Sequence, residues 1–335
     1  MRVILVPQMR VKLRYQEWWP LEMRYQLQER GLEVITLGDD TVHVPEAGSF
    51  SLREEAVAFE MGQMEEFLSM KLEDDDVLFH CDLSFPGIFH SVLAHRRPKR
   101  ALAFVHATAL NAYDLFENIR AQKVALEIGS SAFYDRLLVA TAYHQEKLIP
   151  YALGAQVPVV CMAGLPNPPD SILPPRKPGT WNARYTFASV ARPTLQKVDQ
   201  GVENRIREIS GRAIVRQAVA KEWADYYHFL DDCKFLVITA REETYGYQVV
   251  DALLRGCIPI APRAFSYPEL LPDRLLYRAD GSARGRAEAI LSIASRIEVE
   301  KLKGGWTDPM GELRCADTVS KFWDFLAKEL KGEWT

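Results

Sequence analysis

The clearest hydrophobic pattern lies in the second half of the chain. An apolar run over 235–238 has the length of a buried parallel strand, and a polar turn follows it at 239–244. The next segment, 248–255, carries apolar residues at positions that suit a buried helix, and Gly256 ends that helix. A further apolar run, 258–261, predicts the following strand. This order of strand, turn, helix and strand is typical of open α/β sheets, which bind ligands at such turns.

The same alternation extends over the rest of the chain and predicts an α/β protein. Strands are predicted at 2–6, 33–37, 77–80, 101–105, 136–140, 157–161, 185–190 and 214–219. Helices are predicted at 21–30, 52–72, 201–211, 222–230, 281–296 and 318–331, with another that begins near Thr141. Residues 41–51 are expected to form a loop.

A proline-rich segment separates two halves of ordinary domain size. Residues 164–182 hold six prolines and two glycines, a density that excludes a helix or a central strand. This segment is therefore predicted to be an interdomain linker. It divides the chain of 335 residues into a first domain over 1–163 and a second over 183–315.

Composition excludes several classes of protein. A hydrophobic content of 48% with 26% charged residues is typical of a globular chain. The net charge of −4 gives no global field that favours nucleic acid, although local basic patches are compatible with it. No apolar run reaches membrane-spanning length, so membrane insertion is not expected. Five scattered cysteines without Cys-x-x-Cys spacing argue against disulfide frameworks and metal clusters, and we expect a cytoplasmic protein.

Acidic residues bracket the turn after the strand at 235–238. Glu243 lies at the helix entrance, and Asp251 lies two turns into the helix. Gly246 allows the backbone to approach a ligand closely, and the first N–H groups of the helix can hold an anion. Because a carboxylate would repel a phosphate, we expect Glu243 to accept hydrogen bonds from sugar hydroxyls. Asp251 is suited to do the same for a ribose.

This stretch resembles the Glu-x7-Glu signature of retaining glycosyltransferases with the GT-B fold, of the family-four type. The resemblance implies two Rossmann-like domains that face each other across a cleft, with a final helix in 316–335 that returns to the first domain. It also implies that Glu243 contacts the donor sugar and that Asp251 binds the ribose. Backbone N–H groups that hold the diphosphate would come from Thr244, Tyr245, Gly246 and Tyr247. Asp251 stands where the family has Glu, so its reach is one methylene shorter.

Two further matches follow from the resemblance. Arg192 and Lys197, after the strand at 185–190, are similar to the family's diphosphate-binding pair, although Ala191 replaces the usual glycine before the arginine. Two cations that converge on a pyrophosphate bind the donor and stabilise the leaving group as charge develops. His106, at the carboxyl end of its strand, is similar to a histidine near the donor sugar. A structural histidine is the alternative interpretation.

The acceptor side is less clearly marked, because the first turn of the chain lacks the family's glycines. The segment instead combines cations with aromatic residues, namely Arg10, Lys12, Arg14, Tyr15, Trp18 and Trp19. It is either a first helix with a solvated basic face and two core tryptophans, or an acceptor site with an affinity for phosphate or nucleic acid. Asp82, after the strand at 77–80, is a second candidate for the acceptor side, with a structural role as the alternative. The basic cluster at 96–100 is interpreted as surface.

The resemblance implies transfer of a hexose from a nucleotide-diphosphate sugar, UDP-glucose or GDP-mannose, to a hydroxyl with retained configuration. No metal or other cofactor is expected, since no His/Asp cluster has ligand spacing and the Arg/Lys pair can replace a cation. The segment 256–270 is most similar to tRNA-queuosine mannosyltransferases and more loosely to phage DNA glucosyltransferases, which favours an acceptor in tRNA or DNA. The acidic net charge favours a small molecule, lipid or glycan. A non-catalytic nucleotide-binding protein is a third hypothesis, supported by Asp251 and the glycine-free first turn.

Overall fold

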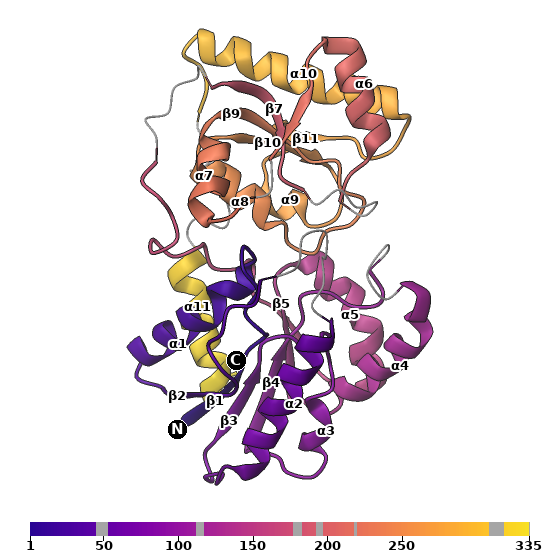
Figure 1. Ribbon diagram of the computed structural model, residues 1–335. Helices are drawn as coiled ribbons and strands as arrows, with labels where there is room; N and C mark the ends of the chain where they lie inside the picture. The colour runs from indigo at the N-terminus through magenta and orange to yellow at the C-terminus, as the bar shows by residue number, and fades with distance from the viewer. Residues whose placement is uncertain are drawn as a thin grey trace. The chain divides into compact units, whose positions relative to one another are not determined.

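The chain forms two compact units in a computed structural model (Figure 1). The structure describes residues 1–44, 53–111, 117–176, 183–191, 197–217, 220–307 and 318–334. Unit 1 contains the described residues up to Pro169 and those from Val319 onwards. Unit 2 contains the described residues from Asp170 to Thr318.

Unit 1 is built on a parallel sheet. Within its described residues, six strands lie in the order β2-β1-β3-β4-β5-β6, and every pairing between neighbours is parallel. The strands are β1 Arg2–Val6, β2 Glu33–Thr36, β3 Val77–His80, β4 Arg100–Phe104, β5 Arg136–Val139 and β6 Val159–Cys161. Residues of β3 are buried throughout, and those of β1 and β4 are buried after their first residue. Burial on both faces explains why these strands read as continuous apolar runs.

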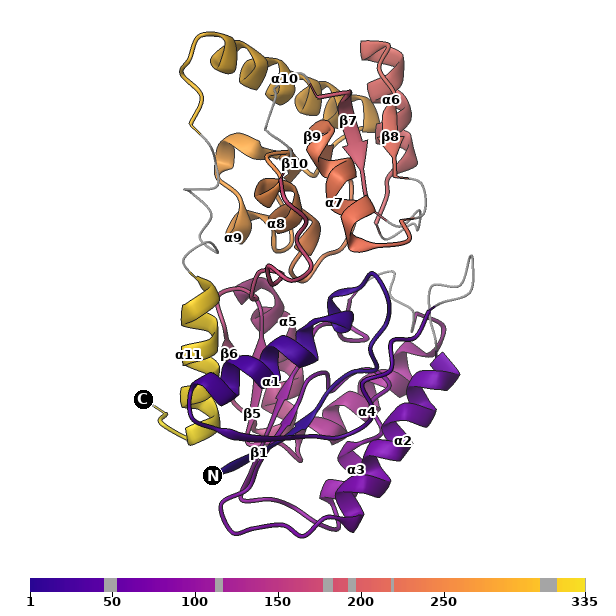
Figure 2. The same cartoon turned by 60° about the vertical axis from the view of Figure 1, so that its left-hand side comes forward.

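Helices cover both faces of this sheet (Figures 1 and 2). They are α1 Trp19–Glu29, α2 Arg53–Ser69, α3 His90–Leu93, α4 Arg120–Ser131, α5 Ala142–Ala155 and α11 Thr318–Lys331, with 3-10 turns at Tyr15–Glu17 and Glu117–Ile119. On one face, Phe67 of α2, Val92 of α3 and Leu148 of α5 join Ile4 and Leu78 of the sheet in one hydrophobic core. Helices α1 and α11 lie on the other face, where Trp19 packs edge-on against Phe104 of β4.

Helix α11 is held in unit 1 by apolar burial and by three arginines. Its side chains Phe322, Trp323, Leu326 and Leu330 are almost completely buried. Arg30 of α1 pairs with Asp324 at 2.8 Å, and Arg136 of β5 pairs with Glu329 at 3.1 Å. Arg100 of β4 donates to the Leu330 carbonyl at 2.8 Å. Helix α11, the last described helix, is therefore part of unit 1 and packs on its sheet.

Unit 2 contains a second parallel sheet. Its described strands lie in the order β11-β10-β9-β7-β8. They are β7 Tyr185–Ser189, β8 Ile214–Arg216, β9 Cys233–Val237, β10 Ile258–Pro262 and β11 Leu276–Tyr277. The helices are α6 Gln200–Ser210, α7 Trp223–Asp231, α8 Tyr247–Leu254, α9 Tyr267–Leu270 and α10 Ala283–Leu302, with a 3-10 turn at Asp273–Leu275.

These observations confirm the predicted α/β class with two Rossmann-like units. The differences are local. Strand β6 begins at Val159 instead of residue 157, because Pro158 has no N–H to donate to a sheet. Helix α10 continues six residues beyond the predicted end at residue 296. Helix α4 was not predicted, and the predicted loop at 41–51 lies partly outside the described residues.

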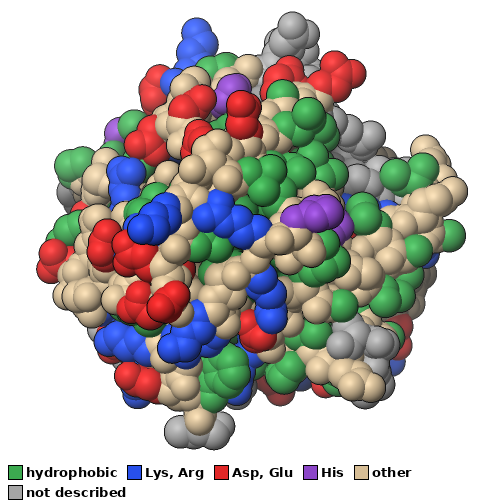
Figure 3. Space-filling view, turned by 90° about the horizontal axis from the view of Figure 1, so that it is seen from below, with side chains coloured by type: hydrophobic (Ala, Val, Ile, Leu, Met, Phe, Trp, Pro, Cys, Tyr) green, Lys and Arg blue, Asp and Glu red, His purple; other side chains and the backbone are tan. Residues whose placement is uncertain are grey.

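Further observations concern surface charge, cysteines and the length of apolar helices. Lysine and arginine side chains lie among aspartates and glutamates on the face shown in Figure 3. In the cluster at 96–100, Arg97 is exposed and pairs with Asp135 at 2.7 Å, as a surface position should. The four cysteines in the described ranges are free thiols, and Cys315 lies outside those ranges. Among the helices that the structure describes, none has the length and apolar character to span a bilayer.

Candidate functional site

The candidate site of unit 2 lies where β9 ends and α8 begins (Figure 1). Gly246 caps α8 with a φ of 90°, a left-handed conformation that favours glycine. A Cβ at this position would lie 3.1 Å from the Tyr267 ring and 3.3 Å from Cγ of Glu243. Backbone conformation and close packing therefore both require glycine here, as expected for a turn that brings backbone close to a ligand.

An ion pair joins two loops at this edge of the sheet. Lys197, after β7, places its Nζ 2.8 Å from Oε2 of Glu243, after β9. The other carboxylate oxygen of Glu243 accepts the backbone N–H of Thr244 at 3.2 Å. Both side chains of the pair are less than one-fifth exposed. The structure thus brings together two residues predicted for the donor site. Their predicted partner Arg192 lies outside the described residues.

The backbone of the turn is fixed by its neighbours. Ser266 donates its hydroxyl to the Tyr245 carbonyl at 3.0 Å, and Tyr245 is buried. The rings of Tyr245 and Tyr247 pack edge to face with centroids 5.2 Å apart. Helix α8 begins at Tyr247, so its first N–H groups follow Glu243 after only Thr244, Tyr245 and Gly246. The predicted roles of these backbone groups stay predictions.

A second set of contacts, not predicted from the sequence, connects the same two loops. Asp199 caps α6 and forms ion pairs with Arg241 at 3.2 Å and with Arg286 at 2.9 Å. Its own N–H donates to the Thr239 hydroxyl at 2.9 Å. Burial raises the pKa of Asp199, but the Val202 N–H and the two guanidinium groups outweigh it and hold the pKa below the usual range. The one sequence feature that could have indicated these contacts is the cation Arg241 within the polar turn at 239–244.

Asp251 is bound on both carboxylate oxygens by tyrosines. Tyr226 donates to Oδ2 at 2.9 Å and Tyr227 donates to Oδ1 at 3.1 Å. Asp251 is only 6% exposed. Burial raises its pKa to about 7, although the two phenol hydroxyls oppose that shift. The predicted ribose role of Asp251 is untested, and its tyrosine partners were missed because their helix was interpreted as core.

In unit 1, His106 lies among aromatic rings. Its ring centroid is 4.7 Å from those of Trp19 and Phe104 and 4.9 Å from that of Tyr15. Burial, with a smaller contribution from His144, lowers the pKa of His106 to about 3. The imidazole is therefore neutral at physiological pH and can act as a hydrogen-bonding group. Its predicted position near a donor sugar stays a prediction.

The basic segment near the start of the chain makes hydrogen bonds to nearby backbone carbonyls. Arg10 donates through Nε to the Glu17 carbonyl at 2.8 Å and through Nη1 to the Asp40 carbonyl. The backbone N–H of Lys12 donates to the His43 carbonyl at 2.9 Å, and the side chains of Lys12 and Arg14 are partly buried. Trp18 and Trp19 are buried, as in the interpretation of this segment as a first helix with two core tryptophans. Acceptor binding by Arg10, Lys12 and Arg14 is untested.

Asp82 is buried at the carboxyl edge of the unit 1 sheet. Its carboxylate accepts from Gln8 Nε2, from the Ser84 N–H at 3.1 Å and from the His106 backbone. Burial raises the pKa of Asp82 to about 7, while the Ser84 N–H, the charge of Lys123 and the His106 N–H oppose the shift. The group predicted for the acceptor side therefore titrates near physiological pH.

Helix α4 makes hydrogen bonds to two loops at this edge of the sheet. These contacts were not predicted from the sequence. Lys123 donates to the Ser84 carbonyl and, at 3.3 Å, to the Pro86 carbonyl. Glu127, one turn later, accepts the Ala109 N–H at 3.1 Å. Both charged side chains are buried. One helix thus supports the loops that carry Asp82 and His106.

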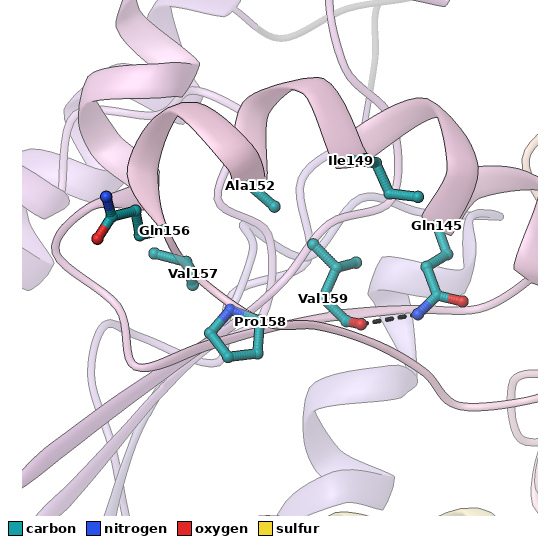
Figure 4. Close-up of a pocket in the computed structure, with 7 residues that line it drawn as sticks. All are labelled: Gln145, Ile149, Ala152, Gln156, Val157, Pro158 and Val159. Carbon is teal, nitrogen blue, oxygen red and sulfur yellow. Dashed lines mark hydrogen bonds between the residues drawn. The ribbon is translucent and has the colours of Figure 1, made fainter.

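A separate hollow of about 310 Å³ lies between α5 and β6 (Figure 4). Its lining residues are Gln145, Ile149, Ala152, Gln156, Val157, Pro158 and Val159. Gln145 donates to the Val159 carbonyl at 2.7 Å, so its amide is already engaged. None of these lining side chains is ionisable, so the hollow offers no acid, base or cation for chemistry.

No protein-family model matches the sequence. Several solved structures match the whole chain in fold. The α,α-trehalose-phosphate synthase (UDP-forming) from Burkholderia vietnamiensis has a TM-score of 0.66 at 12% identity, over 99% of this chain and 98% of that chain. Sucrose-phosphate synthase from Thermosynechococcus elongatus has a TM-score of 0.63 at 12% identity, with the same coverage. Anabaena HepE in complex with UDP and glucose has a TM-score of 0.57 at 12% identity, over 98% of this chain and 95% of that chain. The chain therefore has the GT-B fold of these glycosyltransferases, built from two Rossmann-like units.

Proposed function

We propose that this chain is a glycosyltransferase that moves a hexose from a nucleotide-diphosphate sugar to a hydroxyl acceptor. The observation that carries the proposal is the Lys197–Glu243 pair beside Gly246 and the first turn of α8. A cation and the N–H groups at a helix N-terminus suit a diphosphate, and a carboxylate suits sugar hydroxyls. One edge of one sheet therefore offers partners for both halves of the donor.

The same residues have a chemical role when the donor reacts. As the bond between sugar and diphosphate breaks, negative charge grows on the leaving diphosphate. Lys197 and the N–H groups of Tyr245–Tyr247 stabilise that charge, with Arg192 proposed as a second cation. Glu243 exchanges its contact with Lys197 for sugar hydroxyls when the donor binds. Retention of configuration is inferred from the similarity of Glu243 and Asp251 to the two-acid signature.

For the donor we propose a uridine or guanosine diphosphate sugar. The name of the trehalose-phosphate synthase and the complex of HepE with UDP and glucose support uridine. GDP-mannose is supported by the resemblance of 256–270 to tRNA-queuosine mannosyltransferases. His106 is proposed to contact the donor sugar as a neutral hydrogen-bonding group.

Two acceptor classes have separate support. The resemblance over 256–270 supports a modified nucleoside in tRNA or DNA, bound by Arg10, Lys12, Arg14 and Asp82. The net charge of −4 and the contacts of Arg10 with backbone carbonyls favour a small molecule, lipid or glycan instead. Nucleic-acid binding should weaken steeply as salt concentration rises, because phosphate contacts release counterions. Absent or salt-insensitive binding of tRNA and DNA would favour the second class.

The test begins with thermal unfolding of the protein in the presence of UDP, GDP, ADP, UDP-glucose and GDP-mannose. A ligand at 100 times its Kd stabilises the native state by about 2.7 kcal/mol, which gives a clear rise in Tm. Lys197→Met should abolish that rise. Lys234→Met is the matched control, because Lys234 pairs with Glu298 at 3.6 Å elsewhere in unit 2. If no nucleotide raises the Tm of the wild type, the donor site is wrongly assigned.

A second measurement separates an enzyme from a non-catalytic nucleotide-binding protein. Wild-type protein with the donor identified by thermal unfolding should release nucleoside diphosphate by slow hydrolysis, even without an acceptor. Glu243→Gln should retain nucleoside diphosphate binding and lose this turnover. Nucleotide binding without any turnover in the wild type, with hydroxyl acceptors also supplied, would support the non-catalytic hypothesis.

A further inference from the structure

Two consecutive tyrosines of α7 converge on one carboxylate of α8. The Tyr226 hydroxyl lies 2.9 Å from Oδ2 of Asp251, and the Tyr227 hydroxyl lies 3.1 Å from Oδ1. Neighbouring side chains on a helix point about 100° apart, so the two phenols reach Asp251 from different sides. Because each oxygen has its own donor, the carboxylate is held in one orientation. Each oxygen still has a second lone pair available to a ligand.

The two tyrosines differ in exposure and in their own support. Tyr227 is completely buried, and the guanidinium of Arg255 lies 5.7 Å above its ring. Arg255 is itself fixed by Asp231, which accepts from its Nε at 2.8 Å. Tyr226 is partly exposed and packs edge to face against Tyr227 at 5.1 Å. Tyr227 is therefore part of the buried interior, and Tyr226 is the partly exposed member of the pair.

We propose that Tyr226 and Tyr227 are positioning residues that orient Asp251 to accept hydrogen bonds from ribose hydroxyls, and that Tyr226 determines the preference for ribose over deoxyribose. This inference rests on the proposed nucleotide-sugar function. Aspartate is one methylene shorter than the glutamate of the resembled signature, so its reach depends more strongly on orientation. A carboxylate fixed on both oxygens rejects a sugar that lacks a hydroxyl, because no other group can move in to replace the lost hydrogen bond.

The charges around Asp251 define how the preference depends on pH. From α7 it faces the hydroxyls of Tyr226 and Tyr227. On its own helix, Arg255 is directed to Asp231, and the Cys257 thiol that follows the helix is buried. Burial raises the pKa of Asp251 to about 7, so the carboxylate form predominates at pH 8 and the protonated form at pH 6. Preference for ribose should therefore increase from pH 6 to pH 8.

The experiment compares UDP with 2′-deoxy-UDP by isothermal titration calorimetry at pH 6, 7 and 8. If the thermal measurement identifies guanosine, GDP and 2′-deoxy-GDP replace them. Wild-type protein should prefer the ribonucleotide by about tenfold at pH 8, the size of one hydrogen bond to a charged group. Tyr226→Phe should reduce that preference to about twofold or less and should move its pH midpoint upward, since one donor to the carboxylate is lost.

Tyr134→Phe is the matched control. Tyr134 is a buried tyrosine of unit 1 whose hydroxyl lies 2.7 Å from Nδ1 of His80. This variant should lose stability and keep both the wild-type preference and its pH midpoint. Tyr227→Phe, measured in the same way, carries the test if Tyr226→Phe does not fold.

The outcomes separate this inference from the function on which it rests. If wild-type protein binds no nucleotide, the proposed function fails. If it binds both sugars equally, or if the variant keeps the full preference while only its Tm falls, the tyrosines are structural and the inference is overturned.

Discussion

Replacement of Asp82 by Asn tests the buried carboxyl of unit 1. The folded protein raises the pKa of Asp82 to about 7, whereas an aspartate in an unfolded chain has a pKa of about 3.9. Between these values the folded state binds more protons than the unfolded state. By linkage, the contribution of Asp82 to the free energy of unfolding is present at acidic pH and is lost as pH rises through 7.

The magnitude follows from the two pKa values. At pH 5 the raised pKa contributes about 3 kcal/mol to the free energy of unfolding, and at pH 8 it contributes almost nothing. Asparagine has no such titration, and it fits the site. The Ser84 N–H keeps Oδ1 as its acceptor, and the Gln8 amide, which faces the other oxygen, can rotate to present Oε1, which has no hydrogen-bond partner among the residues described. The stability difference between wild type and Asp82→Asn should therefore change by about 2 to 3 kcal/mol from pH 5 to pH 8.

The assay is urea unfolding of both proteins at pH 5, 6, 7 and 8, followed by tryptophan fluorescence. Trp18, Trp19 and Trp323 are buried in unit 1 and report on it. Asp251 also titrates near pH 7, but both proteins contain it, so its contribution cancels in the difference. A difference that stays constant over this pH range would show that Asp82 is ionised throughout and that the burial argument is wrong.

Three further predictions concern the packing of both units. Gly246→Ala should lower stability by about 1 kcal/mol or more, measured by thermal unfolding, because of its positive φ and its close contacts. Leu326→Ala should cost about 2–5 kcal/mol in urea unfolding, because this α11 side chain is completely buried. Arg255→Met should cost about 3–5 kcal/mol by the same measurement, because it leaves Asp231 buried without its cation.

Each of these changes has a matched control. Gly62→Ala, in the middle of α2 with open space around it, should stabilise the protein or leave it unchanged. Leu302→Ala removes a leucine that is 82% exposed and should have little effect. Arg278→Met breaks an exposed ion pair and should produce no measurable change. Equal losses from a variant and its control would contradict the packing argument in each case.

The sequence was most informative where a short apolar run ends at a turn. Strands β1 and β3 have the predicted bounds because each is a short, continuous apolar run, and helix α11 has them because its apolar residues keep the helical period. The ends of β9 and α8 differ by one or two residues from prediction. Polar groups that this topology brings to one edge, such as Lys197 and Glu243, could also be anticipated.

Contacts between distant segments could not be predicted in the same way. Helix α4 was missed although its buried side includes Lys123 and Glu127, because charged residues at core positions hide the helical pattern. The hydrogen bonds from Tyr226 and Tyr227 to Asp251 depend on how α7 packs against α8. No periodicity along the chain reports that packing, and it decides both the orientation and the pKa of the carboxylate.

The place of α11 in unit 1 has a consequence for biosynthesis. The ribosome makes the sheet of unit 1 first, then all of unit 2, and only afterwards the helix that covers the sheet beside α1. Until Phe322, Trp323 and Leu326 emerge, the apolar surface that they cover on the nascent chain is open to water and to chaperones. Unit 2, by contrast, has all its strands before α11 is translated. Although unit 1 begins first, we expect unit 2 to reach its native state first.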